Sequence, residues 1–216
     1  MKNFVIGIIV AVVLIGGGLL VYNKLFIKNN TVNTNNTTSQ NSANTSSSDI
    51  LDLSNQGLTK LPADVTKKIS LQQLILAHNQ LTSLPSEIGN QDNHKVLNVS
   101  YNLFEGALPG EIRKMTRLET IDASNNKITA IPAEIGQLSF LSILNYSNNN
   151  LDTMPNEIAN CISLQTLDLA NNKYKTISDK VLALNNLKIL NVSGNPLPTS
   201  EITRIRVALP NTNVKF

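Results

Sequence analysis

Few side chains in this sequence are of the types that carry out catalysis. Its single cysteine, Cys161, excludes a disulfide within the chain, and its two histidines, His78 and His94, are too few for an ordinary zinc site. The sequence also lacks a glycine-rich phosphate loop, metal-spaced carboxylates and a Ser/His/Asp arrangement. These features predict a non-enzymatic protein with no catalytic residues, no metal site and no cofactor.

The charges are divided unevenly along the chain. It contains 18 Lys and Arg against 15 Asp and Glu, and Lys2, Lys24 and Lys28 are the only charged residues before Asp49. Residues 49–216 therefore hold equal numbers of basic and acidic side chains, and the excess of positive charge lies at the N-terminus. Because a protein that binds phosphates needs a basic face, this balance argues against a nucleic-acid partner.

The N-terminus contains a long apolar run, FVIGIIVAVVLIGGGLLVY, at residues 4–22. As a helix it would span roughly 29 Å, close to the thickness of a bilayer's hydrocarbon core. We therefore predict an N-terminal transmembrane helix within a membrane anchor at residues 1–28. A cleaved signal peptide is the alternative, but residues 19–22 stay apolar beyond the glycines and no Ala-x-Ala site is present.

The orientation of this anchor is harder to predict. The positive-inside rule is nearly tied, because Lys2 lies on one side of the apolar run and two lysines lie on the other. A short basic N-terminus before a first apolar helix is, however, the arrangement of an export signal. We therefore expect a single-pass membrane protein with a cytoplasmic N-terminus and an extracytoplasmic C-terminal domain.

An Asn/Ser/Thr-rich stretch separates the anchor from the rest of the chain. Residues 29–48 carry no charge, have one apolar side chain larger than Ala (Val32), and show no periodicity. Such a stretch buries too little apolar surface to offset the entropy lost on ordering. We predict a disordered linker at residues 29–49.

The remaining residues repeat with a fixed period. Equivalent apolar positions are separated by 23, 23, 24, 23, 23 and 23 residues, and they are Leu51, Leu74, Leu97, Ile121, Leu144, Leu167 and Leu190. Each unit follows the pattern L-x-x-L-x-L-x-x-N-x-L-x-x-L-P-x-x-I. A period in this range indicates stacked supersecondary units rather than a single-copy fold.

This pattern resembles the leucine-rich-repeat family, specifically its typical 23-residue type, with seven repeats over residues 50–216. The resemblance implies an α/β fold: a right-handed curved solenoid with a concave parallel β-sheet and convex turns or short helices. The L-x-L pairs agree with this independently, because they alternate inward and outward as a strand does. Seven stacked strands can build a core that one strand cannot.

An asparagine recurs at one position of the repeat. A stacked carboxamide can satisfy backbone groups that would otherwise be buried without a partner. We predict this structural role for an Asn ladder, which Gln56 begins in the first unit and which continues with Asn79, Asn102, Asn126, Asn149, Asn172 and Asn195.

Other positions are interpreted as structural punctuation. Prolines at 62, 85, 109, 132 and 155 each precede an acid by two residues, as at a helix start. The third unit has one extra residue and resembles the N-x-F-x-G-x-L-P variant of plant-type repeats, and the polar residues 91–94 before it predict a loose convex turn. Residues 196–216 read as a C-terminal cap, with a short helix at 201–209 and a strand at 213–216.

The two reactive residue types fall within the repeat. Cys161 occupies the position of Met115, Leu138 and Leu184, which predicts a buried apolar residue rather than a reactive thiol. His94 stands where most units place leucine, so we interpret it as a tolerated defect of the repeat rather than as a ligand.

The outward positions of the strands are therefore the candidate binding site. Units two and three bring aliphatic and aromatic side chains together there, and binding sites favour aromatic anchors ringed by polar groups. The candidate contact residues on the concave face are Ile75, His78, Val96, Asn98, Tyr101, Asp122, Asn145 and Asp168.

The sequence thus predicts a membrane-anchored repeat protein that recognises a protein or surface ligand through its concave sheet. This step from fold to function rests on analogy with the family. The alternative is a structural or adhesive component of the cell envelope that binds glycan or matrix through its Asn/Ser-rich face.

Overall fold

A computed structural model describes residues 9–15, 18–24, 49–68 and 70–216 of the chain. The chain divides into two compact units, Met1–Thr45 and Ser46–Phe216. All seven predicted repeats lie in the second unit, and each unit is described by itself below.

In the first unit the described residues form two strands. These are β1 (Ile9–Ile15) and β2 (Gly18–Lys24), which pair antiparallel with Ile9 opposite Lys24 and Ile15 opposite Gly18. The strands stand where the transmembrane helix was predicted, and no helix among the described residues is long and apolar enough to cross a bilayer. An all-apolar run has no periodicity to separate helix from strand, and its many Val and Ile residues favour strands. Membrane attachment remains a prediction, as does the linker, most of which lies outside the described residues.

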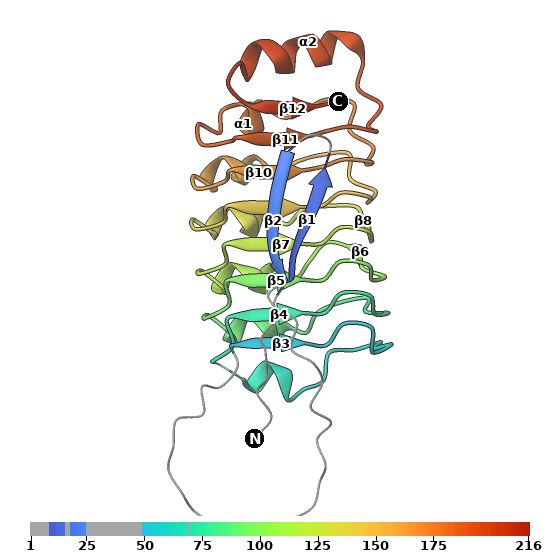
Figure 1. The fold of residues 1–216 in the computed structure, drawn as a ribbon, viewed down its shortest axis with the longest axis vertical. Helices are drawn as coiled ribbons and strands as arrows, with labels where there is room; N and C mark the ends of the chain where they lie inside the picture. Colours follow the sequence, from blue (N-terminus) through green and yellow to red (C-terminus); the bar gives the residue numbers. More distant parts are fainter. Residues whose placement is uncertain (1–8, 16–17, 25–48, 69) are drawn as a thin grey trace, which may run out of the picture. The chain divides into compact units, whose positions relative to one another are not determined.

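The second unit is a stack of coils that each add one short strand to a single parallel sheet (Figure 1). The order in the sheet is β12-β11-β10-β9-β7-β5-β4-β3, so each coil pairs with the coils next to it in the chain. This confirms the predicted solenoid with a parallel sheet. The strands are β3 (Ile50–Asp52), β4 (Gln73–Ile75), β5 (Val96–Asn98), β7 (Thr120–Asp122), β9 (Ile143–Asn145), β10 (Thr166–Asp168), β11 (Ile189–Asn191) and β12 (Asn213–Lys215).

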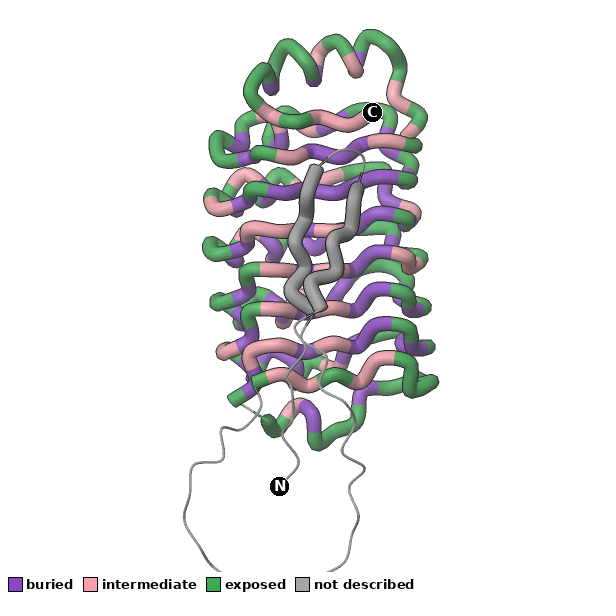
Figure 2. Tube along the Cα trace, viewed as in Figure 1, coloured by how far each residue is buried: buried purple, intermediate pink, exposed green. Residues whose placement is uncertain are grey.

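The strands are held in register by their inward side chains. Leu51 lies opposite Leu74 at one end of the sheet, and Leu190 lies opposite Val214 at the other. From the second to the seventh coil the first inward position of each strand is completely buried, whereas Leu51 and Leu53 of the first coil are only partly buried (Figure 2). A one-residue slip would turn every such leucine outward, so burial fixes the register.

In the first six coils the side away from the sheet is formed by one helical turn. Five are 3-10 helices and the sixth is a short α-helix: η1 (Val65–Lys67), η2 (Ser86–Asn90), η3 (Gly110–Lys114), η4 (Ala133–Gln137), η5 (Asn156–Asn160) and α1 (Asp179–Leu182). From η2 to η5 the repeated proline is the residue before the helix rather than its first residue, and its carbonyl accepts the first backbone bond of the turn. In each of these four helices the repeated glutamate lies in the first turn, as predicted.

The third unit departs from its neighbours in two ways. The segment that contains its extra residue includes β6 (Glu105–Gly106), which pairs in parallel with β8 (Lys127–Ile128) of the next coil and makes a second, two-stranded sheet. The polar turn before it was predicted to be a loose convex turn, and this prediction is wrong, because Gln91 and His94 are completely buried. Their register in the repeat places them in the core despite their polarity.

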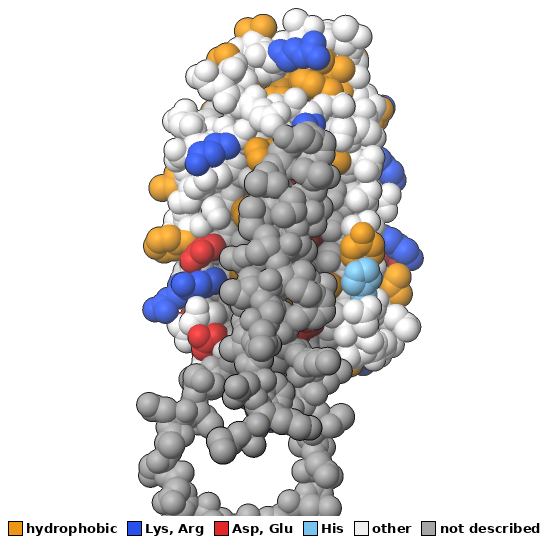
Figure 3. Space-filling model, in the orientation of Figure 1, with side chains coloured by type: hydrophobic (Ala, Val, Ile, Leu, Met, Phe, Trp, Pro, Cys, Tyr) orange, Lys and Arg blue, Asp and Glu red, His pale blue; other side chains and the backbone are white. Residues whose placement is uncertain are grey.

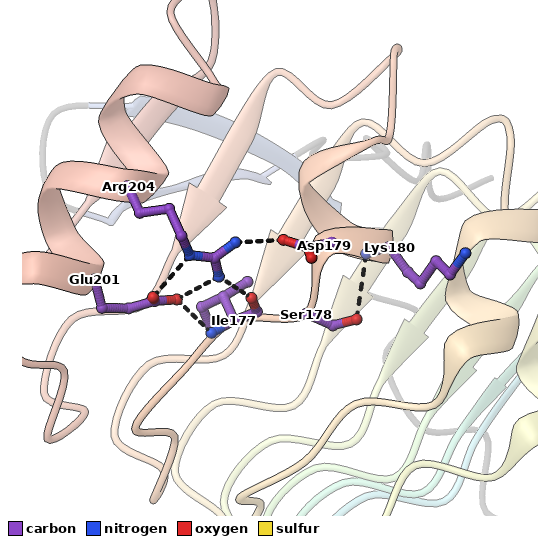
Figure 4. Close-up of polar contacts among 6 residues, drawn as sticks. All are labelled: Ile177, Ser178, Asp179, Lys180, Glu201 and Arg204. Atoms are coloured by element: carbon purple, nitrogen blue, oxygen red, sulfur yellow. Dashed lines mark hydrogen bonds and ion pairs between the residues drawn. The ribbon is translucent and has the colours of Figure 1, made fainter.

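A cap closes the C-terminal end of the stack. Helix α2 (Thr199–Ala208) precedes β12, and Ile205 and Leu209 pack into the core. The helix is also attached by a polar cluster (Figure 4). Glu201 accepts hydrogen bonds from the Ile177 backbone N–H (2.7 Å) and from Arg204 Nε (2.8 Å), and Arg204 also binds Asp179 and the Ile177 carbonyl. The predicted helix and final strand are both present, with bounds shifted by up to two residues.

A candidate binding surface at the sheet and its Asn-turn edge

The Asn ladder lies just beyond the strands, and each side chain binds backbone of its own coil and of the preceding coil. Asn149 is typical: its Nδ2 donates to the carbonyls of Ala123 (3.0 Å) and Tyr146 (3.0 Å), and its Oδ1 accepts from the Ile128 N–H (2.9 Å). The other five asparagines make the equivalent bonds to their own coil and to the preceding one. These side chains are therefore fully engaged in holding coils together, which leaves them no part in binding a ligand.

An outward Asp or Asn ends six of the seven repeat strands, the exception being Ile75 in the second coil, and it makes a different local bond. Asn98 Oδ1 accepts from the Ser100 N–H (2.9 Å) and Ser100 Oγ (2.7 Å), and Asn145 binds Ser147 in the same way. The strands of the first, fourth, sixth and seventh coils repeat the backbone part of this bond. The bond fixes the chain as it leaves the strand, a common role of these residue types. One carboxyl or amide atom of each side chain is thereby used by the fold.

The residue just before each ladder position, Gln56 in the first coil and Asn in the other six, has a left-handed backbone. Its φ lies between +53° and +70° in all seven coils, at Asn55, His78, Tyr101, Asn125, Asn148, Asn171 and Gly194. Asn and Gly adopt this conformation readily, whereas a bulky aromatic residue is an outlier there. We call this row the αL column. Units two and three place His78 and Tyr101 in this column. Histidine is also enriched in the left-handed region, so Tyr101 is the outlier that comes at a cost to the fold.

These two aromatic side chains stack on one another. The ring centroids of His78 and Tyr101 are 4.1 Å apart, and the rings are inclined by 14°. Half of the Tyr101 surface is exposed, and Leu103, two residues further on, is 40% exposed. Figure 3 shows the exposed histidine beside hydrophobic side chains at the edge of this face. The result is a rigid apolar patch with polar tips.

The eight candidate residues do not form one cluster. Ile75 pairs with Asn98, and Val96 lies on the same pair of strands, so these three share the second and third coils with the aromatic stack. The remaining candidates, Asp122, Asn145 and Asp168, continue the outward row over the next three strands. The structure therefore places five of the eight in the second and third coils, the two residues of the stack included. The other three form a polar row on the next three strands. The left-handed backbone is the feature that sequence reasoning missed, although Asn at four of the seven positions and Gly at the last could have signalled it.

The potentially reactive groups lie away from this surface. Cys161 is completely buried, its Sγ lies 3.3 Å from the Ile135 carbonyl, and burial raises the pKa of its thiol to about 11. Such a thiol is not a nucleophile near neutral pH. Among residues 49–68 and 70–216, no three His, Cys, Asp or Glu side chains gather as a metal site would require. On the sheet face, burial raises the pKa of Asp122 above its usual value, although the hydrogen bonds that it accepts from Ser124 oppose the rise.

Comparison with known proteins agrees with this architecture. The family profile described as leucine rich repeat matches residues 69–128. The chain belongs to the leucine-rich-repeat family. The search of curated proteins found no match to the sequence.

Solved leucine-rich-repeat proteins share the fold. The ectodomain of the plant membrane receptor kinase GASSHO1/SCHENGEN3 from Arabidopsis thaliana, in complex with CASPARIAN STRIP INTEGRITY FACTOR 2, is 32% identical, with a TM-score of 0.61 over 72% of this chain and 19% of that one. The plant peptide hormone receptor RGFR1, in complex with RGF2, is 29% identical, with a TM-score of 0.58 over 68% and 24%. An internalin from Listeria monocytogenes shares the fold at 22% identity, with a TM-score of 0.64 over 73% and 44%. This leucine-rich-repeat chain spans about half or less of the length of these structures.

Proposed function

We propose that this leucine-rich-repeat protein recognises another protein or a peptide through the sheet face and its Asn-turn edge, with the His78–Tyr101 stack as the anchor. The observation that carries the proposal is the strained position of the stack. A bulky aromatic residue with φ near +53° costs stability, and such outliers concentrate at functional sites. Because the stack is exposed rather than packed in the core, that cost brings no gain in burial.

The chemistry of the patch supports the same proposal. Tyr101 and His78 offer flat apolar surface with polar atoms at the rim, and Leu103 extends the apolar area. Aromatic anchors of this kind dominate binding energy in protein interfaces. Two of the similar solved structures are receptors determined with their ligands, which supports a protein or peptide partner as the class.

A photocrosslinking experiment on intact cells tests the proposal. A benzophenone amino acid at position 103 is expected to capture a defined partner, whereas the same probe at position 134, on the opposite side of the coil, captures none. With that partner in hand, Tyr101→Ala should weaken binding roughly tenfold or more. The matched control is Phe140→Ala, which removes an aromatic residue that is 62% exposed outside the αL column. Equal affinity for Tyr101→Ala and the unaltered protein would contradict the proposal.

Attachment to a membrane is a second part of the proposal. It rests on the uninterrupted apolar residues 4–22, which are followed by an uncharged stretch before the repeats. We propose that the N-terminus is cytoplasmic and the repeat domain lies outside. Alkaline carbonate extraction should leave the chain in the membrane pellet, and protease added to intact cells should cut between residues 29 and 48. Release into the supernatant, or protection until the cells are lysed, would reverse these assignments.

The glycan-binding alternative makes a different prediction for the same samples. The αL column and the sheet face carry many Asn and Ser side chains, which is the observation that favours it. A glycan array probed with the full chain should then show binding that survives Tyr101→Ala. A protein partner lost on the same substitution, with no glycan bound, favours the main proposal.

A further inference from the structure

The sheet face has a charge that the whole domain lacks. Three outward columns cross it: the first residue of each repeat strand, the third residue, and the position two residues after that. All the charged side chains in these columns are aspartates, namely Asp52, Asp122 and Asp168. The first cation in line with them is Lys215, on the capping strand β12 opposite Asn191. The Lys and Arg residues of the repeats therefore lie on the edges and the outer side.

Aliphatic side chains run beside these aspartates. The first column is Ile50, Gln73, Val96, Thr120, Ile143, Thr166 and Ile189, so most of its members are β-branched. A partner that covers this face must therefore present apolar surface along one line and positive charge along the next. Charge complementarity of this kind sets which partners bind and in which register.

Two of the aspartates are held at fixed positions. Asp122 Oδ1 accepts from the Ser124 N–H (3.0 Å), while Asp168 accepts from the Ala170 N–H (3.0 Å) and from Asn191 Nδ2 (3.0 Å). A carboxylate offers about four acceptor sites, so each keeps capacity for a cation. Asp122 is half-buried and Asp168 is buried with only its edge at the surface (6% exposed), whereas Asp52 is exposed, so a cation that reaches either of the first two is partly desolvated.

The spacing of this pair follows from the sheet. Asp122 ends β7 and Asp168 ends β10, and β9 is the one strand between them. Neighbouring strands are about 4.8 Å apart, so the two carboxylates repeat at roughly 9.6 Å along the stack. In a polyproline II chain, residues i and i+3 lie on the same side and are about 9.3 Å apart. In a β-strand, residues three apart point to opposite sides, which makes that conformation unsuitable.

We propose that the sheet face binds an extended, proline-rich protein segment in the polyproline II conformation, with Lys or Arg at every third residue. The segment runs along the stack and across the strands. One basic side chain binds Asp122, and the next in phase binds Asp168. This inference rests on the proposed recognition function and names the chemistry of the partner. The aromatic stack lies beside β5, one strand before Asp122, where its rings offer a platform for a proline of the same segment.

Synthetic peptides and the full chain in detergent test the inference. The probes are a fluorescein-labelled Pro-Pro-Lys repeat peptide, an isomer of the same composition with the lysines in adjacent pairs, and a Pro-Pro-Glu repeat. Fluorescence anisotropy at low and high salt is expected to show binding of the first only, with affinity that falls as salt rises. Asp122→Asn and Asp168→Asn should each weaken that binding roughly tenfold.

The matched control is Asp52→Asn, in the same column and with the same local bond to the backbone, from Ser54 N–H at 2.9 Å. Because Asp52 is exposed and three strands from Asp122, its loss should change affinity less than about twofold. Circular dichroism of each variant checks that the fold is retained. A helical peptide with lysines seven residues apart is a further probe, because its lysines are about 10.5 Å apart, nearly the spacing of the two aspartates.

The outcomes separate this inference from the broader function. Equal binding of the two lysine isomers, stronger binding of the helical peptide, or equal loss in all three Asp variants would each overturn it. So would no binding of any peptide by a chain that still crosslinks its cellular partner through position 103. Loss of that crosslink as well would instead count against the proposed recognition function.

Discussion

Two neighbouring rows of the repeat use asparagine for different physical reasons. The ladder asparagines are turned inward, and each one's amide binds backbone of its own coil and of the coil before. The residue immediately before each of them belongs to the αL column, where asparagine suits a left-handed backbone rather than a set of hydrogen bonds. In the first row a substitution removes bonds that join one coil to the next. In the second row it changes mainly how well the residue suits a left-handed backbone, which is a smaller cost, and Tyr101 bears such a cost.

The sharpest test of this comparison is to replace each of two adjacent asparagines by alanine, in two separate variants. Asn149→Ala removes three donated bonds to carbonyls and leaves the Ile128 N–H without its acceptor, at a cost of about 3 kcal/mol. Asn148→Ala loses the preference for a left-handed backbone and one exposed hydrogen bond, which Asn148 Oδ1 accepts from Asn171 Nδ2 (2.9 Å), at a total cost of about 1 kcal/mol. Urea denaturation of the two variants measures the difference. Equal losses would mean that the two rows are not distinct.

The cap contains another inward polar residue, Glu201, whose side chain is hydrogen-bonded within the fold as the ladder asparagines are. Glu201→Ala leaves the Ile177 N–H and Arg204 without their shared partner, and we expect a loss of about 2 kcal/mol. The hydrogen bonds from Arg204 hold the pKa of Glu201 below its usual value. A lowered acid pKa stabilises the fold above the unfolded value of about 4.3, and that stabilisation disappears as pH falls through the folded pKa.

A pH series of unfolding experiments measures this contribution. The difference in stability between Glu201→Ala and the unaltered chain should shrink as the pH is lowered below about 4.3. Glu201→Gln keeps an acceptor for Ile177 and serves as the control, with a smaller loss at neutral pH. A difference that stays constant down to pH 2 would show that the carboxylate charge is not involved.

His94 is one of three described residues, with Gln91 and Tyr146, that have a buried side-chain polar atom without a hydrogen-bond partner. Its Nδ1 lies 3.2 Å from the Gln91 carbonyl, but no partner for its buried Nε2 is found among the described residues. His94→Leu restores the leucine of the repeat and should stabilise the fold by about 1 kcal/mol at neutral pH. Burial lowers the pKa of His94, so the folded state favours the neutral ring.

The sign of the pH effect follows from that direction. Between the folded pKa and the unfolded value of about 6.5, the unfolded chain binds more protons, so stability falls as the pH drops through that window. His94→Leu should therefore gain most in mild acid, as measured by the denaturation midpoint at pH 5 and pH 8. A gain that is independent of pH would show that protonation of the ring plays no part.

The smallest expected effect concerns the αL column itself. Tyr101→Asn gives the third coil the residue found at Asn125 and Asn148, and relief of the backbone should stabilise it by about 0.5 kcal/mol. The same change should weaken partner binding, whereas Asn148→Tyr should destabilise the fold without creating affinity. Thermal melts and the crosslinking assay decide the outcome. A Tyr101→Asn variant that is less stable would remove the argument that strain marks the site.

Most of the fold followed from the spacing of apolar residues. The period places Leu74, Leu97 and their equivalents at the centre of each strand, because a half-buried strand tolerates no shift of register. The N-terminal strands were missed, since a continuous apolar run carries no periodicity that separates helix from strand. The turn at residues 91–94 was also misread, because its polarity suggested a loose turn whereas Gln91 and His94 are buried, although His94 does occupy the leucine position that its register predicted.

The candidate site was only partly predictable. Stacking of His78 on Tyr101 follows from their identical place in adjacent coils, which the sequence reveals. The left-handed backbone and the bonds from Asp and Asn side chains to the following N–H groups depend on turn geometry, which no hydrophobic pattern encodes. Both leave a weaker signature: Asn or Gly recurring before the ladder, and Ser recurring two places after an Asx residue.

The strictly sequential order of the sheet gives the molecule a direction. Each strand meets only its neighbours along the chain, so coils can detach one by one without disturbing the rest. The C-terminal coil is closed by a helix and a strand, while the leucines of the first coil are less enclosed. A force applied through residue 49 would accordingly unfold the array from its first coil. The aromatic stack, in the second and third coils, would then bear this force before Asp122 and Asp168 in the fourth and sixth.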